Sequence, residues 1–286
     1  MEVPKIEGHD RFKQIGALAR IDSDKLAAAI RNVRQGRVYD LGLEISDRMP
    51  HGPGFAPFSL AFTHTPEGTA TRSPFEFSAE VITGTPHAGT HIDALIHVQA
   101  NGRVFGGHRV SDVLNEKGWK EHGMETVPAI LGRAVVLDVA AIHGCERLPD
   151  GHEIGINELE SALRTSKQTV NAGDIVLVRT GKIQQFNDPA AFQAGQPGLG
   201  RTAALWLYES GMAVLGTDTA ATEPVPFINP ALSTHRAMLV DSGVHLFENL
   251  NLEELTQDGV TEGFFIALPL KITGATGSWV RPVVII

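Results

Sequence analysis

The apolar and polar positions along the chain predict helices and strands that interleave. From Ser23 to Gly36, apolar residues recur at helical spacing behind a serine suited to the N-cap, which predicts a helix. Helical patterns also cover residues 156–166 and 201–211. Strand patterns cover residues 37–46, 75–83, 133–139, 174–181, 212–218, 236–244, 263–272 and 279–286. Because several strands near the C-terminus follow one another without room for a crossover helix, the pattern predicts an α/β fold with a mixed sheet.

One long segment, Asp47 to Pro74, is rich in proline and shows few periodic signals. Structureless segments of this length in compact domains usually carry function, so we expect a functional loop. The sequence contains no internal repeat and no linker rich enough to divide it. We therefore expect a single domain over residues 37–286, preceded by an N-terminal helical extension over residues 1–36.

Composition narrows the class of partner. The 286 residues carry a net charge of −9 without a basic stripe, which argues against nucleic acid or an anionic membrane and favours a small-molecule ligand. No apolar run approaches the length needed to span a bilayer. The single cysteine, Cys145, excludes an internal disulfide framework, and the first residues lack the order of a secretory signal. We therefore expect a cytoplasmic protein.

The stretch "HAGTHIDALIH", residues 87–97, gathers three histidines and one aspartate. A helix would point Asp93 away from His87 and His91, and an extended strand would hold the two histidines about 13 Å apart. A tight turn at Gly89 instead folds His87 back beside His91, with Asp93 adjacent and His97 one step beyond.

Two imidazoles and a carboxylate without cysteine are typical of catalytic zinc or of manganese. The alternative is a hydrogen-bonded loop network, which we consider much less favoured because so many ligand-type side chains rarely converge without an ion. A histidine without convergent partners receives no role. That applies to His51, His64, His108, His122, His143 and His152.

The same stretch resembles the H-x-G-T-H-x-D-x-P-x-H signature of the cyclase family of metal-dependent hydrolases, which includes bacterial kynurenine formamidase and isatin hydrolase. Leu95 stands where the signature has proline. The segments "GTDTAATEP", "THRAMLVDSGVHLFENL" and "LPLKITGATGSWVRPVVII" resemble further blocks of the family. The resemblance implies the family's swivelling β/β/α-like fold over most of the chain from Val38 onward.

The resemblance also implies roles for individual residues. His87, His91 and Asp93 would bind a divalent metal, zinc or manganese, and His97 would transfer protons. His235 and Glu248 would complete a second metal site bridged by the aspartate. One ion or two remains open, because a glutamate can also serve a mononuclear site; we favour two. Asp218 could orient a ligand or be purely structural.

The implied activity is hydrolysis of a C–N bond in a small, aromatic or cyclic amide by metal-activated water, as in arylformamidases and isatin hydrolase. A ring-closing or lyase-type enzyme acting on a small carboxylate or ester is the alternative. Phe55, Phe58 and Phe75 in the proline-rich region are candidates for the substrate pocket, although packing onto the core would equally explain them. Together with the paired strands, the resemblance also predicts a homodimer or higher homo-oligomer.

Overall fold

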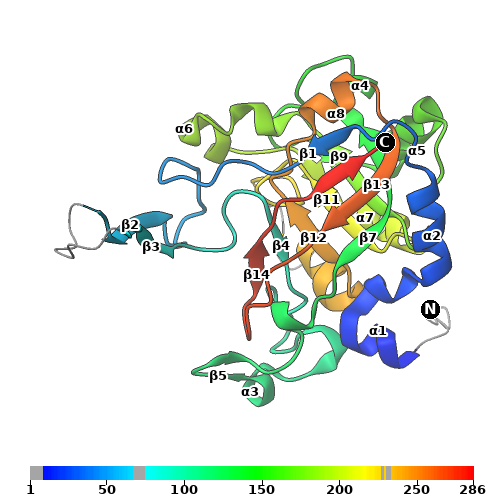
Figure 1. Ribbon diagram of the computed structural model, residues 1–286. Helices are drawn as coiled ribbons and strands as arrows, with labels where there is room; N and C mark the ends of the chain where they lie inside the picture. The colour runs from blue at the N-terminus through cyan, green and yellow to red at the C-terminus, as the bar shows by residue number, and fades with distance from the viewer. Residues whose placement is uncertain (1–8, 67–74, 227–228, 230–232) are drawn as a thin grey trace.

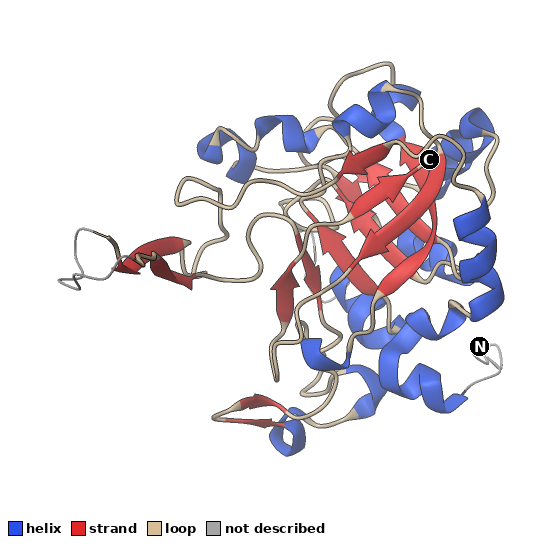
Figure 2. Cartoon of the chain, in the orientation of Figure 1, coloured by secondary structure: helices blue, strands red, loops and turns tan. Residues whose placement is uncertain are grey.

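The computed structural model of the protein describes residues 9–66, 75–226, 229 and 233–286, and a nine-stranded sheet forms its centre (Figures 1 and 2). Strands β7, β9, β11 and β12 run parallel to one another, and the remaining neighbouring pairs of the sheet are antiparallel. The sheet is therefore mixed, as the sequence predicted. Its strands are, in spatial order, β1 (Val38–Asp40), β15 (Val283–Ile285), β13 (Glu262–Ala267), β7 (Ile130–Asp138), β9 (Ile175–Arg179), β11 (Val214–Thr217), β12 (His245–Glu248), β4 (His91–Asp93) and β14 (Gly277–Trp279).

Helices pack around this sheet, and the shorter strands form small pairs outside it. The α-helices are α1 (His9–Ile15), α2 (Ser23–Arg31), α3 (Val110–Val113), α4 (Val139–Ile142), α5 (Ile156–Ser166), α6 (Pro189–Gln193), α7 (Arg201–Glu209) and α8 (Glu253–Gln257). The 3₁₀ and π segments are η1 (Gly16–Arg20), η2 (Phe105–Gly107), η3 (Met124–Thr126), η4 (Lys182–Gln185) and η6 (Arg236–Ser242). The paired short strands are β2 (Ser59–His64) with β3 (Ala79–Thr83), β5 (Leu114–Asn115) with β6 (Gly118–Trp119), and β8 (Glu153–Ile154) with β10 (Gly198–Leu199). None of the helices within the described ranges is long and apolar enough to cross a membrane.

The core lies on both faces of the sheet because alternate residues of each strand point to opposite sides. In β7, Val135 and Leu137 join the cluster that contains α5 and α7, whereas Ala134 and Val136 join the opposite cluster with Phe265. All five are almost fully buried. A sheet buried on both faces gives near-continuous apolar runs, which is why the central strands were readable from sequence.

The N-terminal segment packs onto the main body. Helix α2 is confirmed, but its N-cap is Asp22, whose carboxylate accepts a hydrogen bond from the Lys25 amide at 2.9 Å, and not the expected Ser23. Segment η1 is held by a hydrogen bond from Ala17 N to Gly243 O and by Arg20, which donates to two main-chain carbonyls at 2.7 Å. The extension therefore contributes to the core.

Two predicted segments form a different kind of structure, and the strand predicted over residues 279–286 is limited to β15 (Val283–Ile285) after the end of β14 at Trp279. Residues 59–64 of the expected loop form β2, which pairs with β3 in a hairpin that stands away from the rest of the chain (Figure 1); residues 67–74 of that loop lie outside the described residues. Residues 236–242, predicted as a strand, form the π-helical segment η6. Both errors have physical reasons: the hairpin exposes both faces and lacks a burial period, and a short apolar run does not distinguish strand from buried helix.

Candidate metal centre

The turn at Gly89 brings the first two histidines of the 87–97 stretch together. Gly89 has φ +67°, a conformation that a side chain disfavours. The His87 and His91 rings consequently lie with their centroids 5.4 Å apart. The Gly89 carbonyl accepts hydrogen bonds from His91 Nδ1 and Asn249 Nδ2, both at 2.9 Å. The predicted turn geometry is confirmed, and the turn is tied to the segment after β12.

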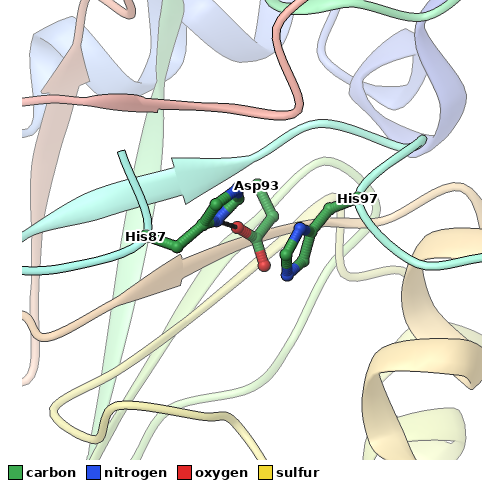
Figure 3. A group of neighbouring side chains, drawn as sticks. All are labelled: His87, Asp93 and His97. Carbon is green, nitrogen blue, oxygen red and sulfur yellow. Dashed lines mark hydrogen bonds and ion pairs between the residues drawn. The ribbon is translucent and has the colours of Figure 1, made fainter. Parts of the chain in front are cut away.

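Asp93, at the end of β4, lies among the histidines. Its Oδ1 is 2.8 Å from His87 Nδ1 and 3.5 Å from His91 Nε2, and its Oδ2 is 3.5 Å from His235 Nε2. His97 follows β4 through a turn, and its ring stacks on that of His87 with centroids 3.8 Å apart. Figure 3 shows His87 and His97 on either side of the Asp93 carboxylate.

The second segment supplies two more side chains to the same place. Glu248, at the end of β12, lies directly opposite His91 in the antiparallel pair β12–β4. Glu248 Oε2 is 3.5 Å from His91 Nε2, and Oε1 is 3.2 Å from His235 Nε2. Two sets of these side chains have donor atoms close enough together to hold a metal ion. One set is His87, Asp93 and His97, and the other is His91, Asp93 and Glu248. The structure thus gathers all six residues that the resemblance selected.

Three supporting residues were not assigned from the sequence. Glu223 Oε2 accepts hydrogen bonds from both the ring Nδ1 and the backbone N of His235. Thr222 donates to Glu248 Oε1 at 3.0 Å, and Thr276 Oγ1 lies 2.9 Å from His87 Nε2. Such partners fix the orientation and tautomer of a ligand-type histidine. The acidic-residue–proline pair in "GTDTAATEP" was the available signal for Glu223; the two threonines had none.

The buried carboxylates of the centre favour the binding of a cation. Asp93, Glu223 and Glu248 are buried. Burial alone would raise the pKa of Asp93, but the surrounding histidines hold it well below its usual value. Burial would likewise lower the pKa of His235, yet Glu223, Glu248 and Asp93 raise it well above the ordinary value. Asp93 Oδ2 is buried without a hydrogen-bond partner. Imidazoles, carboxylates and this unsatisfied oxygen fit a divalent metal of the zinc or manganese type.

His97 differs electrostatically from the other histidines. Burial lowers its pKa to about 4, despite the opposing effect of Asp93. The ring is therefore neutral near pH 7 and can accept a proton.

Two adjoining cavities open at this centre. One, of about 360 Å³, is lined by His87, His91, His97, His235 and Glu248, among others. The other, of about 310 Å³, shares Phe55, His87, Ala220 and Ala221 with the first. Phe55 lies with its ring centroid 5.8 Å from that of His87.

The other two aromatic candidates lie elsewhere in the described structure. Phe58 packs edge-on against Trp279, with ring centroids 5.8 Å apart, and lines neither cavity. Phe75 is 73% exposed and lies near Phe77, also outside both cavities. The aromatic pattern did not separate Phe55 from these two because all three occupy the same proline-rich region.

Asp218 has a structural role. Its Oδ1 accepts hydrogen bonds from Thr180 N and Oγ1, and its Oδ2 accepts one from Gly181 N at 2.7 Å. These bonds join the ends of β9 and β11, and none of them involves a histidine of the centre.

The chain matches the family described as "Putative cyclase" over residues 39–224. The chain belongs to the cyclase family. Kynurenine formamidase of Bacillus mycoides is 28% identical over 247 residues, which cover 86% of this chain and 95% of that protein. A crystal structure described as a novel cyclase is 30% identical, with a TM-score of 0.87 and 96% of each chain covered.

The fold is also similar to that of a more distantly related enzyme. Isatin hydrolase A of Ralstonia solanacearum superimposes with a TM-score of 0.65 at 23% identity, covering 90% of this chain and 94% of its own. At that identity the likeness concerns the fold alone. The mixed α/β fold and the family resemblance predicted from the sequence are both confirmed.

Proposed function

We propose that the chain hydrolyses a C–N bond in a small aromatic or cyclic amide, using a zinc or manganese centre. The observation that carries this proposal is the convergence of His87, His91, Asp93, His235 and Glu248 around one buried point beside a cavity. Such an ion supplies Lewis-acid chemistry: it polarises the scissile carbonyl and makes water acidic enough to attack near neutral pH.

We assign the metal-ligand role to those five side chains and the proton-transfer role to His97. The neutral ring of His97 lines the cavity and can take the proton of the attacking water, then return it to the leaving nitrogen. Its stacking on His87 holds the ring beside the centre. Glu223 and Thr222 orient His235 and Glu248 through hydrogen bonds.

The lining of the second cavity favours the binding of a neutral substrate. Its described lining residues include Phe55, Phe192 and Val225 but no Lys, Arg, Asp or Glu. A substrate carrying an amino-acid group, such as N-formylkynurenine, would leave two charges without partners there, and desolvating unpaired charges is costly. A flat amide such as isatin leaves none. No contact among the described cavity residues favours the ring-closing or lyase alternative.

The test is a direct comparison of the two substrates with metal-loaded protein. We expect isatin to be opened to its acid with a higher kcat/KM than that for release of formate from N-formylkynurenine. A protein that hydrolyses neither, with its metal content verified, contradicts the proposed function. Preference for N-formylkynurenine would support the proposed hydrolase activity but contradict the inference that the cavity favours a neutral substrate.

We further propose that the protein is a homodimer. Both faces of the β2–β3 hairpin are exposed, and its apolar side chains Leu60, Phe62, Val81 and Ile82 are 47%, 61%, 50% and 52% exposed. An isolated two-stranded hairpin is only marginally stable in water. A second copy of the chain covering this hairpin would bury the exposed apolar surface.

A further inference from the structure

A second group of ligand-type side chains lies outside the metal centre. His143 Nε2 and His152 Nε2 approach the same oxygen, Glu158 Oε1, at 2.6 and 2.7 Å. The two rings are nearly perpendicular, with centroids 5.1 Å apart. One donor atom from each of the three residues lies within 4.8 Å of the others. The group therefore has the size of a metal-ligand set.

The fold holds the carboxylate of this group in place. Glu158 is in the first turn of α5, where its Oε2 accepts a hydrogen bond from Gly155 N at 2.7 Å. One oxygen is thereby anchored, and the other faces the histidines. His143 directly follows α4, which packs on α5, and His152 directly precedes β8.

The charge and exposure of the group suit a cation from solution. The Glu158 carboxylate supplies the negative charge of the group, and its Oε1 is the oxygen that faces both histidines. The side chains of His143, His152 and Glu158 are 38%, 25% and 21% exposed. Water and ions can reach all three.

We propose that His143, His152 and Glu158 form a separate binding site for a divalent ion of the zinc type. Two imidazoles and one carboxylate match zinc's preferred donors and leave a position for water. Donor atoms around tetrahedral zinc are about 3.4 Å apart, so each histidine must withdraw from Glu158 by less than about 1 Å. Each imidazole must also present Nε2 without its proton, which the other tautomer allows.

The proposed site would give a role to His143 and His152, to which the sequence analysis assigned none. Their nearest ligand-type neighbours in the sequence, Cys145, Asp150 and Glu153, are not members of the group. The packing of α4 on α5 brings His143 to Glu158, and His152 reaches the same oxygen from six residues earlier in the chain.

The test compares Zn²⁺ binding by the intact chain and by two variants, using equilibrium dialysis at micromolar free Zn²⁺ with elemental analysis. His143→Ala removes a partly exposed ligand, and Glu158→Gln removes the charge while keeping a side chain that can bond the Gly155 amide. His108→Ala is the matched control, because His108 is exposed and lies outside the group. Circular dichroism verifies that each variant is folded.

We expect the parent and His108→Ala to bind one more equivalent of Zn²⁺ than His143→Ala and Glu158→Gln. Hydrolase activity should be unchanged in all three variants, since none of these residues lies in the centre around Asp93. Equal Zn²⁺ binding by the parent, His143→Ala and Glu158→Gln would overturn the proposal. Loss of an equivalent in His108→Ala as well would also overturn it, because the extra ion would then bind nonspecifically.

Discussion

His91 and Glu248 are direct cross-strand partners in β4 and β12, and this register places His91 Nε2 3.5 Å from Glu248 Oε2. The other oxygen of Glu248 lies 3.2 Å from His235 Nε2. Asp93 spans the same two histidines with its own two oxygens, each at 3.5 Å. If two divalent ions were bound, Asp93 and Glu248 would be the residues able to hold both, and their negative charges would offset the repulsion between the ions.

Glu248→Gln should therefore change the number of metal ions bound. A neutral amide lacks the second anionic oxygen, so we expect the parent to bind two equivalents and the variant one. Titration of apo-protein with Zn²⁺ and with Mn²⁺ measures this, in the background of His143→Ala so that the α4–α5 group does not contribute. One equivalent in both proteins would show that Glu248 serves a mononuclear site.

Replacing His97 should separate chemistry from metal binding. We expect His97→Ala to lower kcat by about 100-fold, because a positioned general acid–base group contributes about that much or more. Metal content should stay close to that of the parent. Elemental analysis beside steady-state kinetics checks both. Loss of metal from the variant would instead make His97 a ligand, which its place with His87 and Asp93 also permits.

The parts of this molecule that could be predicted are those that depend on local sequence. The apolar runs of the buried strands and the short connections near the C-terminus predicted the mixed sheet, and Gly89 predicted the turn that brings His87 to His91. Glu223 and Thr276 could not be assigned in the same way, since Glu223 meets His235 across 12 residues and Thr276 meets His87 across 189, and both contacts depend on the fold.

Leu95 shows why a departure from a family signature can leave the site intact. It occupies the second position of the turn closed by His97 N and Ala94 O, where proline is also favoured. Its side chain is buried in the same cluster as Ala17 of the N-terminal segment. The packing of Leu95 thus fixes the turn that proline would stiffen. This packing involves the N-terminal segment, so the sequence pattern did not predict it.

Thr276 should act as a positioning residue for His87. Thr276→Val keeps the shape of the side chain but removes the oxygen 2.9 Å from His87 Nε2, whereas Thr276→Ser keeps that oxygen. Loss of such a partner typically weakens metal affinity by about 10- to 100-fold. Competition with a chelator should show this loss for valine and near-parental affinity for serine. Identical metal affinities in the two variants would contradict a positioning role for Thr276.

The hairpin should hold the dimer together. Light scattering of the parent is expected to give twice the chain mass of 30.7 kDa. Phe62→Glu places a charge on the exposed face of β2 and should give the mass of one chain. Ile30→Glu, at a residue 51% exposed on α2, is the control and should remain dimeric. A parent that is monomeric at micromolar concentration contradicts the proposal.

Asp218 should make stability depend on pH. Burial raises its pKa to about 6, although Thr180 and Gly181 donate hydrogen bonds that oppose this. A carboxyl whose pKa is higher in the folded than in the unfolded chain favours folding below the unfolded value of 3.8, and that contribution is lost as the pH rises through about 6. The full change corresponds to about 3 kcal/mol.

Asp218→Asn isolates this contribution because asparagine does not titrate, while every other group is common to both proteins. Urea unfolding of the two proteins should show the free energy of unfolding of the parent falling relative to the variant by roughly 2 kcal/mol from about pH 4 to about pH 7. The asparagine NH₂ faces the Gly181 amide, so the variant is expected to be less stable at both pH values, and only the difference between them is diagnostic. A parent that instead gains stability relative to Asp218→Asn over this range would show that the three hydrogen bonds outweigh burial and that Asp218 is ionised throughout.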